Sequence, residues 1–328
     1  MGEGAFFQVK NVFELDPRRP SCHGSTITEL PNGDLLAAWY AGSYEKAGDV
    51  AILCSRLPRE EDKWSEPIVL ADTPDKSEGN PVLFVDDKRN VWLFFVTMYG
   101  AGWTTCKIKC KKSADGGFTW GRTRVLRHRL GWMARNKPII LENGDILLPV
   151  YDETKWHSMV MISEDGGETW NSYGDIGAPQ GVIQPTVVQL SNCSLLMYMR
   201  TGGGGGCIWK SVSLDDGRTW SSASPTPLRN PNSAIELVKL ASGNIALAFN
   251  DTTRGRTPLN IALSLDEGAT WPFNGVLEAG EGEFSYPAII QDADGYIHIV
   301  YTNRRVNIRH VKTNEAWIKE GGKQTLSG

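Results

Sequence analysis

The chain has 328 residues and a formal net charge of −4, with 34 basic and 38 acidic residues. This balance argues against a general polyanion-binding surface, so we expect no nucleic-acid partner. No apolar run approaches 18 residues, which argues against a membrane-spanning helix, and a chain of this length can bury a core without disulfides.

The start of the chain, MGEGAFFQVKNVFEL, has no signal-peptide pattern. Localisation therefore stays open between the cytoplasm and secretion after a signal has been removed, and the sequence says nothing about oligomeric state. Six cysteines occur, but none has zinc-ligand spacing with a second pair or a histidine. We interpret them as isolated thiols and expect neither a metal nor another cofactor.

Six times along the chain a short polar turn precedes an apolar strand. The copies are NGDLLAAWY (32–40), DDKRNVWLFFV (86–96), ENGDILLPVY (142–151), SNCSLLMYMR (191–200), ASGNIALAFN (241–250) and DADGYIHIVYT (292–302). Equivalent points in them are 57, 54, 49, 50 and 52 residues apart. Each strand has another apolar segment before it and a third strand after it, which predicts a repeated all-β unit.

Four of these units carry the same turn, SxDxGxTW. Its copies are Ser113–Trp120, Ser163–Trp170, Ser213–Trp220 and Ser264–Trp271, and their tryptophans are 50, 50 and 51 residues apart. Aspartate followed by glycine suits a tight turn, because aspartate bonds nearby backbone and glycine adopts positive φ. The tryptophan is expected to bury its ring while its N–H finds a partner.

Six units of about 50 residues predict a six-bladed β-propeller of four-stranded antiparallel blades. We expect one domain over residues 1–328, with a strand in 6–15 completing the last blade and closing the ring. The competing all-β fold, a long sandwich, does not explain six nearly equal repeats.

In such a propeller, the starts of the innermost strands and the loops after the second strands face one shared mouth. Polar residues at these positions include His23, Tyr40, Glu45, Asp49, Asn80, Arg135, Glu153, Gln184, Arg200, Asn232, Arg256, Glu283, Tyr286, Arg304 and Arg305. Arginines 135, 200 and 256 come from different units. A guanidinium matches a carboxylate in two-point geometry, so their convergence predicts an anionic ligand. The alternative is that each arginine pairs with a local acid.

The four boxes are Asp-boxes, and over roughly residues 20–310 the chain resembles the sialidase superfamily of BNR-repeat propellers. This resemblance implies an exo-glycosidase that holds the carboxylate of a terminal acidic sugar with three arginines and attacks its anomeric carbon with a tyrosine. Tyr286, in FSYPAII, matches the tyrosine, and Arg200 and Arg256 match two of the arginines. Glu45 is the nearest counterpart of the family's acid/base aspartate, with Asp49 second.

Two positions depart from the family pattern. His23 stands where the first arginine is expected, and Gln184 stands where a glutamate activates the tyrosine. Arg135 is a candidate replacement for the arginine, and Glu283 or Glu236 for the base. We also expect Tyr40, Asn80, Gln184, Asn232 and Arg304 among the substrate contacts.

Three hypotheses remain open. The first is a sialidase-like exo-glycosidase acting on a glycan that ends in an acidic sugar. The second is a lyase or glycosidase of uronic-acid chains that uses His23 and Tyr286 as acid and base, since histidine titrates near neutrality. The third is a propeller that binds glycans without catalysis.

Overall fold

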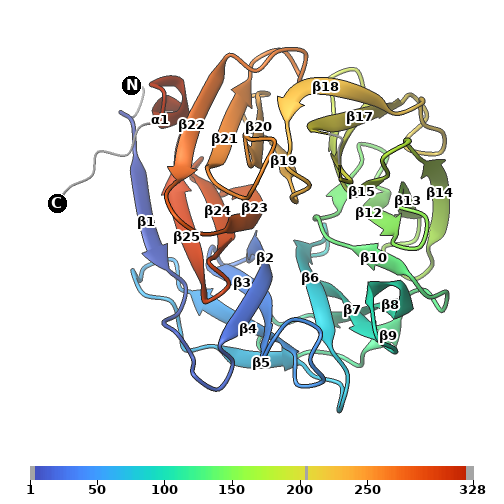
Figure 1. Ribbon diagram of the computed structural model, residues 1–328, viewed down its shortest axis with the longest axis vertical. Helices are drawn as coiled ribbons and strands as arrows, with labels where there is room; N and C mark the ends of the chain where they lie inside the picture. Colours follow the sequence, from blue (N-terminus) through green and yellow to red (C-terminus); the bar gives the residue numbers. More distant parts are fainter. Residues whose placement is uncertain (1–3, 204–205, 323–328) are drawn as a thin grey trace.

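The computed structural model describes residues 4–203 and 206–322, so the predicted domain of 1–328 extends past the described part at both ends. Six antiparallel sheets lie as blades around a central axis (Figure 1), which confirms the predicted six-bladed β-propeller. The described residues also form one short helix, α1 (Glu315–Lys319), and one 3-10 turn, η1 (Trp103–Thr105). No helix in this part of the chain is long and apolar enough to cross a bilayer.

The strands are numbered in chain order and given for each blade from the innermost strand outward. Blade 1 contains β2 (Ser21–Glu29), β3 (Leu35–Gly42), β4 (Ala51–Leu57) and β5 (Ile68–Ala71). Blade 2 contains β6 (Glu78–Val85), β7 (Val91–Met98), β8 (Cys106–Ser113) and β9 (Arg124–Val125). Blade 3 contains β10 (Trp132–Ala134) with β11 (Ile139–Ile140), β12 (Ile146–Asp152), β13 (His157–Ser163) and β14 (Asn171–Ile176). Blade 4 contains β15 (Val182–Gln189), β16 (Leu195–Thr201), β17 (Cys207–Ser213) and β18 (Ser224–Arg229). Blade 5 contains β19 (Glu236–Lys239), β20 (Ile245–Phe249), β21 (Leu259–Ser264) and β22 (Phe273–Glu278). Blade 6 contains β23 (Phe284–Gln291), β24 (Ile297–Asn303), β25 (Asn307–Thr313) and β1 (Phe7–Asn11).

Blade 6 is built from both ends of the chain. Strand β1 pairs antiparallel with β25, with Phe7 opposite Thr313 and Asn11 opposite Arg309. Strand β1 therefore occupies residues 7–11 of the segment 6–15, which the sequence predicts to complete the last blade. Pairing of the two ends closes the ring without a covalent link and covers the outer edge of β25.

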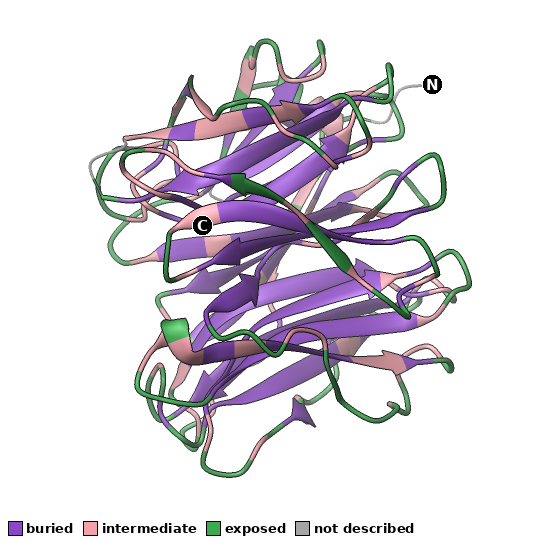
Figure 2. Cartoon of the chain, turned by 90° about the vertical axis from the view of Figure 1, so that its right-hand side faces the viewer, coloured by how far each residue is buried: buried purple, intermediate pink, exposed green. Residues whose placement is uncertain are grey.

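The hydrophobic core lies between blades rather than at one centre. Six buried clusters occur, and each joins one pair of neighbouring blades, so that together they run around the whole ring. Figure 2 shows the consequence: the strands are mostly buried, and exposed residues gather in the loops at either face. Loops at one end of the central axis are therefore free to carry a site on a rigid support.

The Asp-box turns fasten each blade to the one before it. In the blade 3 box, Asp165 accepts hydrogen bonds from the backbone and hydroxyl of Thr169, and Ser163 Oγ accepts from the Gly167 amide. A Cβ on the glycine at the fifth position of each box would lie 2.5–3.4 Å from a side chain of the preceding blade; these side chains are Leu36, Trp92, Leu147 and Leu196. The box tryptophans are half-buried, and their N–H groups donate to a box carbonyl or, for Trp271, to Tyr198.

Candidate active site

A bulge at the start of the inner strands turns polar side chains toward the central axis. The strand register shifts between Gly79 and Val82, between Ile183 and Thr186, and between Ser285 and Ala288. The residue inside each shift has positive φ and precedes a proline; these residues are Asn80 (44°), Gln184 (52°) and Tyr286 (54°). Proline has no N–H for the ladder, so the bulge falls where pairing is already interrupted. Non-glycine residues with positive φ are typical of functional sites.

Tyr286 lies at the centre of the candidate site. Its hydroxyl oxygen accepts hydrogen bonds from Arg200 Nη1 at 2.9 Å and from Gln184 Nε2 at 3.3 Å. The His23 ring packs against the phenol, with 4.1 Å between the ring centroids. Blades 1, 4 and 6 thus contribute to one contact cluster.

Three guanidinium groups surround the Tyr286 ring. Their central carbons lie 5.1 Å (Arg135), 5.3 Å (Arg256) and 5.8 Å (Arg200) from its centroid. Arg135 follows β10, Arg200 lies on β16 and Arg256 lies between β20 and β21, so three separate blades supply them. This is the convergence that the repeat positions predict.

The arginines differ in how far protein groups satisfy them. Arg200 donates to Asn232 Oδ1 at 2.8 Å and to Gln184 Oε1 at 2.9 Å, both of which are neutral. Arg135 is 1% exposed and donates to two backbone carbonyls of β23, while its Nε and Nη1 have no partner among the described residues. Arg256 alone of the three pairs with an acid, Glu283, at 2.7 Å. A local acid therefore neutralises one of the three arginines.

Glu283 is tied into an ion-pair network. Besides Arg256, it binds Arg305 at 3.1 Å, and Arg305 binds Glu45 at 2.5 Å. Burial would raise the pKa of Glu283, but the hydrogen bond from Ser285 and the two arginine charges together hold it below its usual value. The two pairs raise the pKa of the Arg305 guanidinium. The carboxylates of Glu283 and Glu45 are therefore both paired with arginine.

Asp49, the second acid/base candidate, binds its own loop. Its carboxylate accepts from the Ser43 amide and from Ser43 Oγ at 3.0 Å. This arrangement fixes the loop between β3 and β4, which also carries Glu45.

Glu153 is a carboxyl for which the sequence suggested no role beyond pairing with an arginine. It follows β12, near Arg200 and Lys46, and no hydrogen bond to its side chain is found in the described part of the chain. Burial raises the pKa of Glu153 to about 7, against the smaller lowering effects of the two cations. No sequence pattern marks it, because its environment comes from three different blades.

His23 is neutral in this setting. It is 2% exposed, and its Nδ1 lies 2.9 Å from Thr302 Oγ1. Burial and the surrounding arginine charges hold the pKa of His23 well below its ordinary value. The same charges also lower the pKa of the Tyr286 phenol: burial raises that pKa, but Arg200 and Arg256 lower it by more, so the balance lies below the usual value.

The remaining predicted residues divide into near and far groups. Asn80 donates to the Tyr151 hydroxyl at 3.2 Å, and Tyr40 packs edge-on against His23 at 5.7 Å. Arg304 is exposed, and its guanidinium lies over the Phe284 ring at 5.7 Å instead of the Tyr286 ring. Its neighbour Arg305 makes the site's ion pairs. Nothing in the sequence distinguishes these adjacent arginines.

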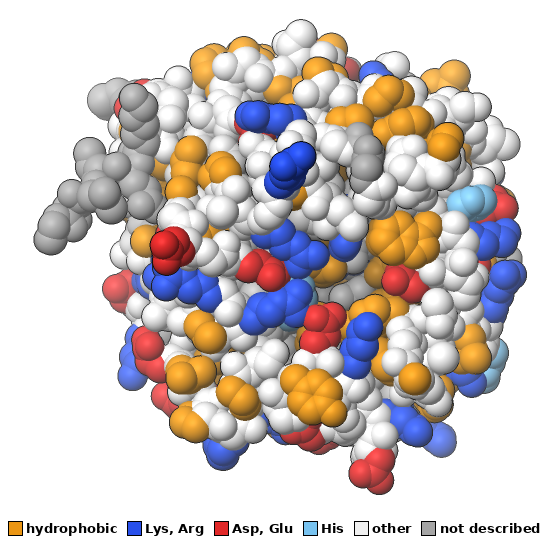
Figure 3. Space-filling view, in the orientation of Figure 1, with side chains coloured by type: hydrophobic (Ala, Val, Ile, Leu, Met, Phe, Trp, Pro, Cys, Tyr) orange, Lys and Arg blue, Asp and Glu red, His pale blue; other side chains and the backbone are white. Residues whose placement is uncertain are grey.

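The surface around this cluster is strongly charged. Figure 3 shows a hollow near the central axis, with basic and acidic side chains gathered around its edge. Among the described residues, no three His, Cys, Asp or Glu side chains are arranged to hold a metal ion. The arrangement can bind an anion and place a phenol oxygen against it.

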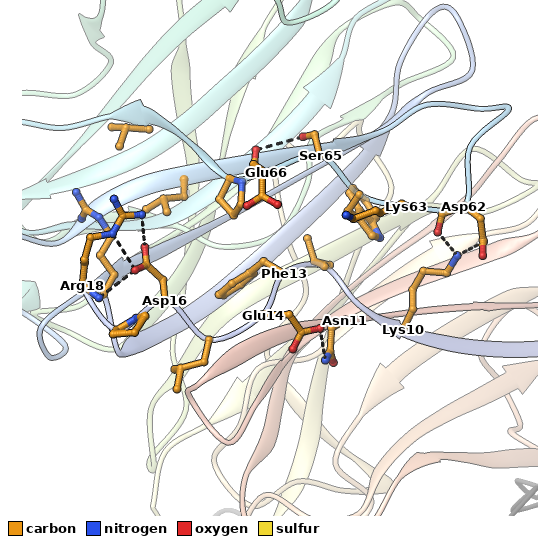
Figure 4. A pocket seen from close by; sticks show the side chains of 18 of the residues that line it. Lys10, Asn11, Phe13, Glu14, Asp16, Arg18, Asp62, Lys63, Ser65 and Glu66 are labelled. Carbon is orange, nitrogen blue, oxygen red and sulfur yellow. Dashed lines mark hydrogen bonds and ion pairs between the residues drawn. The ribbon is translucent and has the colours of Figure 1, made fainter.

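A second hollow lies at the seam between blades 1 and 6. It is a cleft of about 990 Å³ lined by residues in 10–19 and 62–67. Figure 4 shows two ion pairs in it, Arg18 with Asp16 and Lys10 with Asp62. These four groups are therefore already neutralised by each other.

Comparison with known proteins gives consistent results. The family model of the BNR repeat-like domain matches residues 33–299. A sialidase of Micromonospora viridifaciens is 24% identical over 343 residues, covering 91% of this chain and 52% of its own length. A sialidase of Bacteroides fragilis is 26% identical over 227 residues, covering 59% and 41%. The chain thus spans about half the length of these relatives.

Solved structures agree on the fold. The intramolecular trans-sialidase from Ruminococcus gnavus, solved with oseltamivir carboxylate, superposes with a TM-score of 0.81 at 15% identity, covering 96% of this chain and 98% of the other. At this identity the likeness extends to the architecture and not to the chemistry.

Proposed function

Because the chain belongs to the BNR repeat-like domain family of sialidase-type propellers, we propose that it is an exo-glycosidase that removes a terminal acidic sugar, sialic acid or a relative, from a glycan. One observation carries this proposal: three guanidinium groups surround Tyr286, and only one of them is paired with an acid. A carboxylate bound there would give Arg200, whose partners are neutral, a charged partner and would lie beside the Arg256–Glu283 pair.

In this proposal the residues have separate roles. Arg200 and Arg256 hold the sugar carboxylate, and Arg135 adds positive charge from beneath the phenol. Tyr286 Oη, having given its own proton to solvent water, attacks the anomeric carbon while the bond to the leaving oxygen breaks, and a carboxylic acid gives that oxygen its proton. Water then displaces the tyrosine, and the carboxylate takes the proton from water.

The proton donor is best supplied by Glu153. A pKa of about 7 leaves a large fraction of this carboxyl protonated at neutral pH and still able to ionise. Glu45 and Asp49, the candidates from the family resemblance, are already bound to Arg305 and Ser43. Glu153 thus replaces Glu45 or Asp49 as the proton donor of the same glycosidase reaction, and no further group is needed.

A second candidate function rests on His23. Its ring contacts Tyr286, and Gln184 replaces the glutamate base that the family resemblance leads one to expect. In a uronate lyase, Tyr286 or His23 would remove the proton next to the carboxylate, the leaving oxygen would gain a proton, and the product would carry a double bond. The arginines would make that proton more acidic.

The test compares sialoside hydrolysis with elimination from uronate oligosaccharides. We expect release from a fluorogenic sialoside, and a loss of roughly 10³-fold in kcat/KM in Tyr286→Phe. Tyr173→Phe, on the outer strand β14, is the matched control and should keep full activity. An absorbing unsaturated product would favour the lyase. Glycan binding without turnover of either substrate would identify a binding protein and overturn the enzyme assignment.

A further inference from the structure

Arg200 fixes which way the Gln184 amide points. Arg200 Nη1 lies 2.9 Å from Gln184 Oε1, and a guanidinium can only donate, so the amide oxygen has to face it. The NH₂ end therefore faces two phenols, at 3.3 Å from Tyr286 Oη and 3.5 Å from Tyr151 Oη. Gln184 cannot accept a proton from Tyr286 in this orientation.

The Tyr286 oxygen consequently receives hydrogen bonds from two sides. Arg200 Nη1 donates at 2.9 Å and Gln184 Nε2 at 3.3 Å, while no acceptor for the phenol's own proton lies within residues 4–203 and 206–322. We propose that Gln184 and Arg200 hold Tyr286 as a phenolate, with Gln184 as a positioning donor where a general base would otherwise be required. The proposal deepens the function given above and rests on it only for the role of Tyr286 as nucleophile.

The charges around the phenol act in the same direction. Arg135 and Arg256 lie 5.1 and 5.3 Å from the ring, and burial competes with the arginines but leaves the pKa of Tyr286 lowered. The groups facing the phenol from every element that packs on it are Arg135 after β10, Arg200 on β16, Arg256 before β21, neutral His23 on β2, Tyr40 on β3, Tyr151 on β12, and the Glu283–Arg305 pair of blade 6. Positive charge exceeds negative charge in this set.

A phenolate changes the proton balance of the first chemical step. Its oxygen forms the bond to the anomeric carbon with no proton to lose, and the only proton that moves goes to the leaving oxygen. A glutamate at position 184 would have to accept a proton and would place a negative charge beside the phenol. Glutamine does neither, so this substitution is compatible with nucleophilic catalysis.

The ionisation of Tyr286 can be measured without any substrate. Protein labelled with ¹³C at tyrosine Cζ would be titrated by NMR from about pH 5 to about pH 10, since ordinary tyrosines ionise near pH 10. The resonance that disappears in Tyr286→Phe identifies the residue. We expect it at the phenolate position at neutral pH, where the other tyrosines still show the protonated phenol.

Variants separate Gln184 from the arginines. Gln184→Leu removes the donor and Gln184→Glu adds a charge, so both should raise the Tyr286 midpoint, the second by about tenfold or more in proton affinity. Gln189→Leu, on the same strand but bonded to Glu142 and Cys193, should leave it unchanged. The other tyrosine resonances report whether each variant remains folded.

Two results would overturn the inference: Tyr286 titrating with the ordinary tyrosines, or a midpoint that does not respond to Gln184→Leu in a folded protein. Its failure is distinguishable from failure of the proposed function. Sialoside turnover with an ordinary Tyr286 titration removes only the phenolate, whereas a low midpoint without turnover of any acidic-sugar substrate removes only the activity.

Discussion

At the scale of single residues, the mouth of the propeller shifts the pKa values of two acidic side chains in opposite directions. Glu153 is half-buried with little compensation, so its pKa rises to about 7. Tyr286 is half-buried too, but Arg200 and Arg256 outweigh that effect and its pKa falls. Such separation of pKa values within one site is how acid and base or nucleophile roles are divided.

Replacing Glu153 by glutamine should stabilise the protein above neutrality. Below about pH 4.5 the carboxyl is protonated in both the folded and the unfolded state, and the variant should match the parent. Between about pH 4.5 and pH 7 the unfolded chain has released this proton while the folded protein still holds it, so the parent loses stability over that window, and Glu153→Gln should gain about 2 kcal/mol in the free energy of unfolding at pH 8. Urea denaturation at pH 5 and pH 8 measures this. If the variant and the parent have equal free energies of unfolding at both pH values, the assigned burial cost is contradicted.

At the scale of elements, the Asp-box turn couples neighbouring blades. Gly167, in the blade 3 box, has φ of +91°, and a Cβ there would lie 2.5 Å from the Trp92 ring of blade 2. Trp92 is 1% exposed and its N–H bonds Asp86 at 2.9 Å, so the ring has little room to move. The turn thus needs glycine both for its backbone and for the contact.

Gly167→Ala should therefore cost more than alanine at another positive-φ glycine. Gly144 has φ of +88°, and a Cβ there would meet nothing within 4 Å, so Gly144→Ala isolates the backbone strain. We expect about 1 kcal/mol for Gly144→Ala and about 3 kcal/mol for Gly167→Ala. Parallel urea titrations give both values. Similar losses would mean that the contact with Trp92 does not couple the blades.

The bulges of the inner strands are the second feature at this scale. The X-Pro steps at Asn80, Gln184 and Tyr286 are visible in the sequence, and they place the bulges. The repeat positions include residues that the ring brings together, such as Gln184, Arg200 and Tyr286. They were not enough to say which of them touch, because each bulge sets a side-chain direction that depends on its own blade.

At the scale of the whole molecule, ring closure depends on a seam between blades 6 and 1. His298 and His310 stack there with 5.1 Å between centroids, Asp292 binds His298 at 2.8 Å, and Trp64 of blade 1 packs edge-on against His310. Burial holds the pKa of both imidazoles below the usual value, His310 the more strongly. The seam is thus built for neutral histidines.

Acid should weaken this seam. A folded pKa below the unfolded one means that the stabilisation is complete above about pH 6.5 and is lost as pH falls, because only the unfolded chain then takes up the proton. We expect the Tm to drop between pH 7 and pH 5, and to drop less in His310→Gln. His128→Gln, at a position outside the seam, is the control and should follow the parent. Parallel curves for all three proteins would contradict the role of His310.

The architecture could be predicted from the amino-acid sequence alone. A repeat of about 50 residues, four Asp-boxes and polar-to-apolar alternation are local and periodic, and a periodic chain can bury its apolar faces only by stacking equal units around an axis. The same periodicity placed Tyr286, Arg135, Arg200 and Arg256 at one end of that axis.

How those residues meet is a property of the assembled ring. It pairs Arg256 with Glu283, leaves Arg200 with neutral partners, selects Arg305 over Arg304 for the ion pairs, and leaves Glu153 half-buried. The physical reason is that charge balance, burial and hydrogen-bond direction depend on side chains from different blades. The distances between these side chains are fixed by closing the ring and cannot be predicted from any single repeat.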